Sequence, residues 1–293
     1  PQNCSISPDG SKMGDYVKRL GQKPKFYRLG QATFVLIDEV NDLPSAYSPE
    51  TKVQSDSMRK SAPNKNLQEV FNTQEVFFDY VNVCNKHFRP CTKSLFLYQE
   101  IINRRKKDNL PELISECGAG SFLDLVYRTL IEWGMDARRA KLVDFGIFKD
   151  SISNHVKELE ELSDYNICDL NQQNLDALFS KIVILFTNMK VMNSTCRIVG
   201  VSKALHFLLP DLIMPIDRNY TLRFYYGKPQ VTFSTIKSEI NVFKRIFTDA
   251  FHLVQQLPLT QAVVDGQGWN QNVPKLIDNA LIGYRKSCQN HSN

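Results

Sequence analysis

Three residue types that can do chemistry occur together between Arg197 and Gly227. They are Lys203, His206 and Asp217. A lysine can anchor a phosphate, or attack a carbon atom as a free amine when burial lowers its pKa. An aspartate held rigidly at a helix start can act as a general base or as an electrostatic stabiliser. We therefore predict Lys203 and Asp217 as candidate catalytic residues and His206 as a candidate binding residue.

Each of these residues also has a purely structural interpretation. Lys203 can be an exposed lysine at a helix start. His206 lies within the apolar run Ala204 to Leu209, where a histidine more often hydrogen-bonds a carbonyl group than it catalyses. Asp217 can simply cap a helix, a role worth about 1 kcal/mol. Both interpretations stay open at the level of the sequence.

The elements that must position these residues are two helices joined by a turn. Pro210 and Pro215 bracket the turn, because proline lacks a helix donor and moves the residue before it out of the α region. A second helix is then predicted from Asp217 to Tyr226, since a carboxylate satisfies first-turn N–H groups and suits the positive helix end. The expected arrangement is helix, proline-bounded turn, helix.

Cations and aromatic rings close to these elements are the other candidate binding residues. Arg218 and Tyr220 follow the aspartate directly. Trp133 stands just before Arg138 and Arg139, in a turn where a ring and cations lie close in sequence. This combination could grip a phosphate or a base, although a tryptophan at a helix end usually belongs to the core.

Several well-known catalytic and cofactor-binding motifs are missing from the sequence. It contains no recognisable spacing of paired carboxylates, no H-E-x-x-H, no G-x-S-x-G and no P-loop. The stretch from Gly118 to Gly120 follows no strand and does not qualify as a nucleotide-binding loop. The seven cysteines include no C-x-x-C pair, which argues against a zinc site or a disulfide framework. We therefore predict no cofactor and no metal.

The composition is that of an ordinary folded protein with a mild excess of positive charge. Of the 293 residues, 42% are hydrophobic and 23% are charged, and the formal net charge is +5. This charge gives mild support for an anionic partner such as DNA. The basic run Arg104 to Lys107 is interpreted as a solvated helix end in preference to a phosphate-binding patch, although this cluster adds to the support for nucleic-acid binding. Because no signal-peptide pattern or membrane-length apolar run occurs, we predict a soluble, cytoplasmic protein without a membrane partner.

The N-terminal part of the chain differs in composition from the rest. Residues 1 to 74 are rich in Ser, Pro, Asn, Gln and Lys. Apolar segments at 25–29 and 32–40 predict a β-hairpin, and the polar stretch 42–66 predicts a mobile linker. Residues 1 to 74 are therefore expected to form an appendage to the main domain.

Residues 75 to 293 show the spacing of helices. Apolar residues recur there at intervals of three and four, which is typical of buried helical faces. Long helices are expected over 142–162, 170–189 and 236–257, and a last one starts at Pro274. The predicted fold class is mainly α, with one multi-helix globular domain over residues 75 to 293.

Three signatures resemble those of a widespread, mostly prokaryotic family of uncharacterised proteins. The first is W-G-M at Trp133 to Met135, and the last is I-D-N-x-x-I-G at Ile277 to Gly283. Between them, S-K-x-L-H-x-L-L-P-x-L and P-x-D-R-x-Y-T-x-x-F span Ser202 to Phe224. The resemblance covers roughly residues 75 to 287 and implies a shared fold unit, without implying an activity.

The same stretch also resembles, more weakly, the helix-hairpin-helix DNA glycosylases. The shared order is a V-G turn, a lysine, an apolar helix, a proline loop, a hydrophobic-Asp-Arg sequence and a helix that ends in glycine. The resemblance implies that Val199 to Val201, with Gly200, form a hairpin whose backbone holds a DNA phosphate. It further implies that Lys203 is the nucleophile and that Asp217 assists departure of a flipped base.

These observations lead to one predicted function and two alternatives. The leading prediction is a nucleic-acid-binding protein with DNA base-excision glycosylase or lyase activity. The first alternative is a non-enzymatic helical interaction module, in which Asp217 is only a cap. The second is a small-molecule enzyme whose pocket is formed by Trp133, His206, Asp217 and Tyr220.

Overall fold

The structure is a computed structural model. It describes residues 4–7, 25–29, 32–36, 66–137, 140–194, 196–228 and 231–290. The chain divides into two compact units, Pro1–Lys60 and Ser61–Asn293. The sequence placed a boundary after residue 74, whereas the helical unit already includes the short helix α2 (Leu67–Val70), which packs on α12 (Ile236–Gln256).

The N-terminal unit contains a three-stranded antiparallel sheet. Its strands are β1 (Cys4–Ser7), β2 (Lys25–Leu29) and β3 (Ala32–Leu36), in the order β1-β3-β2. Strands β2 and β3 pair in antiparallel register up to Leu29 and Ala32, so the two predicted strands do pair with each other. Strand β1 was not predicted, because its CSIS sequence has a weak strand pattern. Positions 37–40 and 42–65 of the predicted strand and linker lie outside the described residues.

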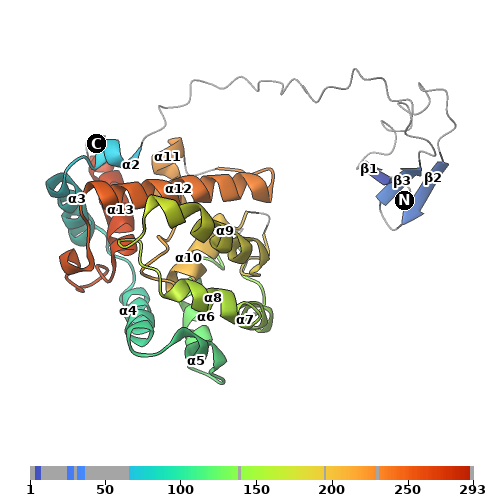
Figure 1. The fold of residues 1–293 in the computed structure, drawn as a ribbon, viewed down its shortest axis with the longest axis horizontal. Coiled ribbons are helices and arrows are strands. Elements are labelled where there is room, and N and C mark those ends of the chain that lie inside the picture. The colour runs from blue at the N-terminus through green and yellow to red at the C-terminus, as the bar shows by residue number, and fades with distance from the viewer. Residues whose placement is uncertain are drawn as a thin grey trace, which may run out of the picture. The chain divides into compact units, whose positions relative to one another are not determined.

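The second unit is helical, which confirms the predicted mainly α class (Figure 1). Its remaining helices are α3 (Gln74–His87), α4 (Thr92–Lys107), α5 (Leu110–Ser115), α6 (Phe122–Glu132), α7 (Phe145–Ser153), α8 (Val156–Ser163), α9 (Gln172–Asn188), α10 (Ile198–Leu208), η1 (Arg218–Leu222), α11 (Arg223–Tyr226), η2 (Gln261–Val263) and α13 (Val273–Asn290). Among these described helices, none combines the length and the apolar character needed to cross a membrane.

The segment 142–162, predicted as one long helix, is broken in two places. Leu142 forms an isolated β-bridge with Met192 instead of starting a helix. Helix α7 begins only after Asp144, whose side chain accepts a hydrogen bond from the Gly146 N–H. The chain then turns at Asn154, where α7 ends, before α8 begins. The prediction of one continuous helix was wrong because the spacing of apolar residues does not show where polar residues begin or end a helix.

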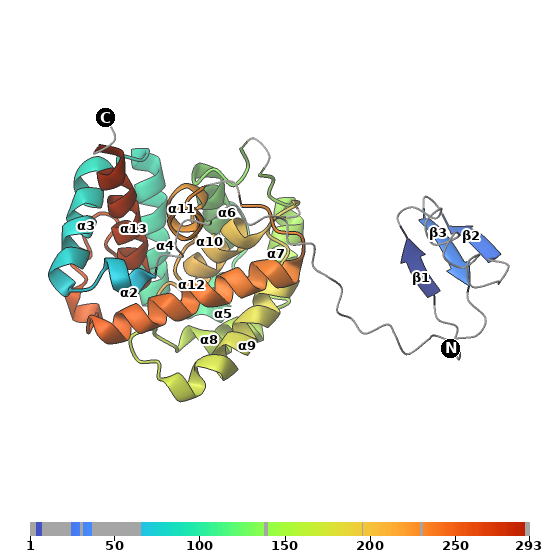
Figure 2. The same ribbon diagram turned by 90° about the horizontal axis from the view of Figure 1, so that it is seen from above.

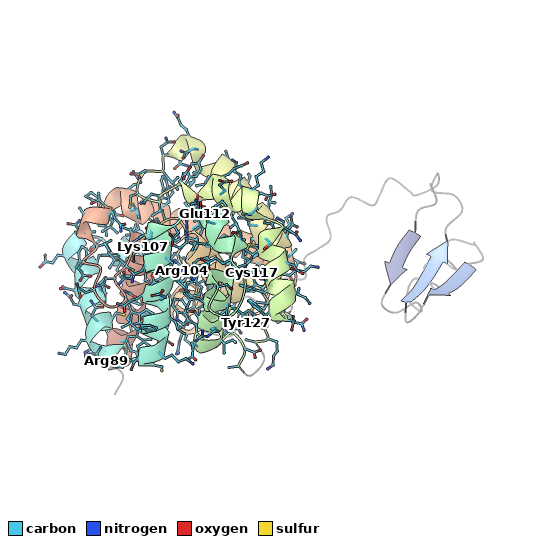
Figure 3. The ribbon with its side chains drawn as sticks, turned by 90° about the horizontal axis from the view of Figure 1, so that it is seen from below. Arg89, Arg104, Lys107, Glu112, Cys117 and Tyr127 are labelled. Carbon is cyan, nitrogen blue, oxygen red and sulfur yellow. The ribbon has the colours of Figure 1, made fainter. Side chains whose placement is uncertain are left out.

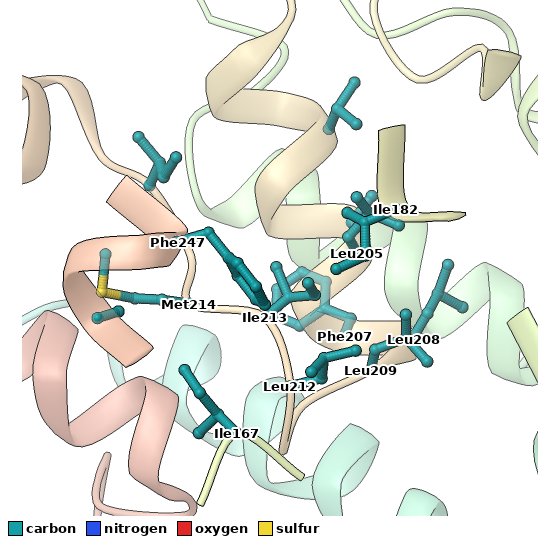
Figure 4. Packing of buried hydrophobic residues seen from close by; sticks show 14 of the residues in the cluster. Ile167, Ile182, Leu205, Phe207, Leu208, Leu209, Leu212, Ile213, Met214 and Phe247 are labelled. Atoms are coloured by element: carbon teal, nitrogen blue, oxygen red, sulfur yellow. The ribbon is translucent and has the colours of Figure 1, made fainter. Parts of the chain in front are cut away.

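Helix α10 forms the centre of the core. Every residue from Ile198 to Leu208 is buried, including Lys203 and His206. Figure 4 shows side chains of this helix and of the following proline-bounded loop packed together with Phe247 of α12. The burial of α10 fits the apolar run Ala204 to Leu209, and the loop that follows is part of the core as well.

Helices α3 and α13 pack side by side along their length (Figure 2). Gly283 of α13 lies directly against the backbone of α3. A Cβ atom at this position would overlap the carbonyl oxygen of Tyr80 and lie 2.7 Å from its carbonyl carbon. The close approach therefore requires glycine, and it holds α13 in place as a wall of the site described next.

Candidate functional site

Asp217 ends the proline-bounded loop and starts a π-helical turn. Its Oδ1 atom accepts a hydrogen bond from the Asn219 N–H at 2.7 Å, so it is an N-cap as predicted. The predicted single helix instead begins as the π-helix η1, in which the Leu222 N–H donates to the Asp217 carbonyl at 2.9 Å. The α-helical turn α11 follows and ends at Gly227, whose φ is +70°. Isolated π-helical turns occur frequently at functional sites.

The loop places Asp217 beside Lys203. The Ile216 N–H donates to the Ser202 hydroxyl at 3.1 Å, which ties the end of the loop to α10. As a result, Lys203 Nζ lies 3.2 Å from Asp217 Oδ2. The lysine side chain is 6% exposed and the aspartate 27%, so the ion pair is buried on one side and open on the other. The structure thus brings together the two predicted catalytic residues, fourteen positions apart in sequence.

Both residues line a cavity of about 310 Å³. The cavity is formed by Phe88, Pro90, Ser94, Glu132, Trp133, Gly134, Lys203, Pro215, Asp217, Tyr220, Trp269, Lys275, Asp278 and Ile282. Among the predicted binding residues, Trp133 and Tyr220 are part of this lining. Its volume is at the lower end of the range of ligand pockets, and it suits one small planar molecule.

Aromatic rings make up much of the cavity wall. The ring centroids of Trp133 and Trp269 are 5.9 Å apart, and Phe88 contacts both Trp269 and Tyr220 edge-on. Behind the wall, Tyr98 stacks on Trp269 with an interplanar angle of 20°. Lys203 Nζ lies 5.5 Å from the Trp133 ring centroid, within the range of a cation–π contact. Rings held this rigidly can stack against a flat ligand.

A second lysine–aspartate pair, Lys275 and Asp278, is also part of the lining. Lys275 Nζ donates to Asp278 Oδ2 at 2.7 Å, and the two side chains are only 2% and 7% exposed. Lys275 also donates to Asn279 Oδ1, and its Nζ lies 5.4 Å from the Trp269 ring centroid. Burial raises the pKa of Asp278, Lys275 opposes this shift, and Asp217 adds to it. The two pairs therefore act on each other electrostatically.

Sequence reasoning missed three of these residues, Trp269, Lys275 and Asp278. A usable signal was present, since Lys275 and Asp278 stand three residues apart among apolar residues of α13, and charges in such positions are rarely buried without a function or partner. Asp278 is also part of the I-D-N-x-x-I-G signature. Nothing in the sequence, however, indicates that α13 lies next to α3 and η1.

His206 is a correction to the predicted binding residues, because it does not line the cavity. It is fully buried, and its Nδ1–H donates to the Ile213 carbonyl at 2.7 Å. Its Nε2 accepts from the Tyr98 hydroxyl at 3.1 Å, and that hydroxyl accepts from Asn272. Burial lowers the pKa of His206 to about 3. The residue is therefore a neutral member of a buried network that holds Tyr98 behind the cavity wall.

This network predicts a pH effect on stability. The pKa of His206 falls from 6.5 in the unfolded chain to about 3 in the fold, so the unfolded chain binds the proton first as the pH falls. Below about pH 6.5 the fold then loses up to about 1.4 kcal/mol per pH unit through this residue. His206→Asn, which strands the Tyr98 hydroxyl, should cost about 1–3 kcal/mol at pH 7.

Chemical denaturation of both proteins at several pH values checks this prediction. The difference in unfolding free energy between wild type and His206→Asn should shrink steadily from pH 6.5 towards pH 3, since only the wild type carries the histidine penalty. Two curves that stay parallel over this window would show that His206 titrates normally in the fold.

Gly200 is a second correction. Residues Val199 to Val201 lie in the first turn of α10 and form no separate hairpin. The N–H groups of Arg197 and Ile198 at this helix start donate to the buried carboxylate of Glu239, at 2.9 and 2.8 Å. A Cβ atom at Gly200 would overlap the Met192 side chain. The glycine therefore permits close packing, and the place expected for a DNA phosphate is closed by a carboxylate.

The predicted basic residues lie outside the cavity lining. Arg218 is exposed next to Asp217, with its guanidinium 3.7 Å from the Cys196 sulfur. Arg138 and Arg139 lie outside the described residues. The exposed Arg89 stands between Phe88 and Pro90 of the lining, at the end of α4 opposite to Arg104 and Lys107 (Figure 3).

The basic run at the end of α4 is distant from the cavity and partly engaged. Ten residues separate Ser94 from Arg104, about 15 Å along a helix. Arg104 pairs with Glu116, and Arg105 Nε donates to the Leu208 carbonyl at 3.0 Å. These two arginines therefore connect α4 to Glu116 and to the end of α10. The interpretation of this run as an ordinary helix end fits the structure better than a phosphate patch does.

The cavity offers an organic ligand carboxylates, ammonium groups and rings, but its donor set is not that of a metal centre. Within the described part of the chain, no group of three or more His, Cys, Asp or Glu side chains could hold a metal ion.

Comparisons of this chain with protein-family models, with curated proteins and with solved structures gave no match.

Proposed function

We propose that this protein binds a nucleotide extruded from nucleic acid and cleaves the bond between its base and its sugar. The observation that carries this proposal is the Lys203–Asp217 pair, 3.2 Å apart, at the edge of a cavity with two tryptophans. Enzymes that act on a base in a duplex take it out of the stack into a pocket and hold it between aromatic or apolar side chains.

The size and lining of the cavity support a single base as its ligand. A volume of about 310 Å³ admits one base with part of its sugar, and excludes a duplex. Base stacking on an aromatic side chain contributes about 1–3 kcal/mol, independent of sequence. Trp133 and Trp269 both line the cavity, and we expect one of these rings to provide it. The exposed cations Arg89 and Arg218 lie next to lining residues in sequence, where the flanking phosphates would pass.

Asp217 and Lys203 have separate roles in the proposed reaction. As the base leaves, positive charge develops on the sugar, and the carboxylate of Asp217 stabilises it. Asp217 Oδ2 is also within reach of the Lys203 ammonium group and can accept its proton. The free amine then bonds to C1′ of the sugar, the bond from C1′ to the base breaks, and its electron pair leaves with the base. The base takes the proton that Asp217 had accepted, which restores the carboxylate. When the sugar ring opens, the electron pair of the C1′–O4′ bond moves to O4′, which takes a second proton from the lysine nitrogen, and a protonated Schiff base remains at Lys203.

A second candidate function is cleavage of the same bond in a free nucleoside. It is favoured by the charge of the cavity lining. The lining contains three carboxylates but only two ammonium groups: Glu132, Asp217 and Asp278 carry the carboxylates, and Lys203 and Lys275 carry the ammonium groups. Such a lining does not attract phosphate. Comparing the rate of base release from free nucleosides and from duplexes distinguishes the two functions, because only binding of a duplex requires cations outside the cavity.

Borohydride trapping tests the proposed roles. We incubate the protein with duplexes that carry damaged bases or abasic sites, reduce with borohydride and measure the cross-linked fraction. The wild type is expected to give a covalent adduct and to release base. Lys203→Arg keeps a cation beside Asp217 but has no primary amine, so the adduct should fall at least about 100-fold.

Lys93→Ala is the matched control for this experiment. Lys93 is an exposed lysine paired with Glu132 of the lining, so its loss alters the rim of the cavity without touching the Lys203–Asp217 pair. This variant should give the wild-type adduct. An adduct that survives Lys203→Arg would assign the nucleophile to another amine. Absence of adduct, base release and salt-sensitive binding in the wild type would instead favour the helical interaction module.

A further inference from the structure

We propose that the base held in this cavity donates an N–H group to Oδ1 of Asp278 and accepts a hydrogen bond from Nε1 of Trp133. This inference rests on the proposed function, since it specifies which edge of the base the same cavity recognises. It makes Asp278 and Trp133 the residues that determine specificity, while Lys203 and Asp217 act on the bond to the sugar.

Asp278 offers an acceptor that the described residues leave unused. Asp278 is 5% exposed and lines the cavity. One carboxylate oxygen, Oδ2, accepts from Lys275 at 2.7 Å. The other oxygen, Oδ1, is buried and has no hydrogen-bond partner among the described residues. An unpaired buried carboxylate oxygen is costly, and a ligand N–H group removes that cost when it binds.

Trp133 offers the matching donor. Its indole Nε1 is buried, and no acceptor for it is found within the described part of the chain. Trp133 lines the cavity, and Lys203 Nζ lies over the face of its ring. An indole N–H usually finds an acceptor when it is buried. Two residues of the cavity lining therefore hold a buried acceptor and a buried donor that have no partner among the described residues, and aromatic rings lie beside them.

This combination defines a class of ligand. The pairing edge of each common base carries an N–H donor next to an acceptor atom, and flipped bases are commonly read along that edge. Lys275 cannot take over Oδ1 without leaving Oδ2 and Asn279. The expected substrates are therefore bases that retain an N–H group on this edge, and bases whose amino group carries two methyl groups are excluded.

Calorimetric titration with free bases tests the inference without requiring catalysis. The probes are adenine and cytosine methylated at the nitrogen that bears the sugar, together with their analogues whose amino group is dimethylated. We expect wild-type protein to bind the amino forms at least about tenfold more tightly than the dimethylated forms, as for a hydrogen bond to a charged group. Equal binding of the two forms would overturn the inference.

Two variants separate the two contacts. Asp278→Asn keeps the shape of the side chain, but with its oxygen turned to Lys275 it presents an N–H group to the ligand, so the preference for amino forms should disappear. Trp133→Phe removes the donor and keeps a smaller aromatic ring, so it should weaken binding of amino and dimethylated forms by similar factors. This second variant keeps the test decisive if Asp278→Asn does not fold. Unchanged binding in Trp133→Phe would contradict the proposed donor.

The outcomes distinguish this inference from the proposed function. If amino bases bind with the expected preference but no substrate loses its base, edge recognition stands and the cleavage proposal fails. If bases are released while both forms bind equally, cleavage stands and edge recognition fails.

Discussion

Asp217→Asn is expected to lower kcat/KM for base release at least about 100-fold while leaving the helical unit folded. The substitution removes the negative charge that stabilises the positive charge developing on the sugar as the base leaves. The geometry separates the two roles of this residue. Oδ1 caps η1 through the Asn219 N–H, and Oδ2 faces Lys203. Asparagine caps a helix about as well as aspartate, so the first role survives and the second does not. Steady-state base release, with thermal unfolding in parallel, measures both.

Asp144→Asn is the matched control for this substitution. Asp144 is also an N-cap, with its Oδ1 accepting from the Gly146 N–H at 2.8 Å, but it is exposed and lies outside the cavity lining. This variant should keep both activity and stability. If Asp217→Asn instead unfolds the protein to the same extent that it loses activity, Asp217 is a structural cap, as the interaction-module alternative holds.

Gly283→Ala is expected to lower the free energy of unfolding by about 3 kcal/mol, because the new methyl group would occupy the space of an α3 carbonyl group. The neighbour is the Tyr80 backbone, and Cys84 N would lie at 3.1 Å from the same Cβ, so no side-chain rotation can relieve the overlap. The helices must separate. Since α13 carries Lys275 and Asp278, the separation should also weaken ligand binding.

The Gly146→Ala variant provides the comparison for Gly283→Ala. Gly146 lies in the first turn of α7, is exposed, and would place its Cβ 3.2 Å from only the Asp144 side chain. The same chemical change there should alter stability by no more than about 1 kcal/mol, because alanine favours a helix. Denaturant unfolding of both variants checks the prediction. Similar midpoints for the two would mean that α3 and α13 are not in backbone contact.

Sequence patterns predicted the elements whose signals are local. Helix α6 begins after its Ser121 cap and ends before Gly134, and Asp217 caps η1, because capping and left-handed glycines depend on a few adjacent residues. The adjacency of Lys203 and Asp217 also follows from a local feature, the short loop closed by two prolines. For these features the sequence contained the physical cause.

Other features depend on distant neighbours that no local pattern records. Helix α10 extends six residues before the predicted apolar run because Glu239 of α12 supplies acceptors for its first N–H groups. The second lysine–aspartate pair reaches the cavity because a glycine lets α13 approach α3. His206 belongs to a network with Tyr98 and Asn272, which are far from it in sequence. These contacts arise from tertiary packing alone.

Intrinsic tryptophan fluorescence gives the most direct test that the cavity receives a base. The protein has two tryptophans, Trp133 and Trp269, and both line the cavity. A base stacked against either ring quenches its emission, so every fluorescence change reports on this site. The titration uses a duplex with one mismatched base, the fully paired duplex and a free nucleoside, at two salt concentrations.

We predict saturable quenching by the mismatched duplex, stronger than by the paired duplex, competed by the free nucleoside and weakened at higher salt. Asp217→Asn should retain the quenching, because it affects cleavage and leaves the rings in place. Salt-sensitive binding of the duplex without any change in fluorescence would contradict the account, since it would place the nucleic acid away from the cavity.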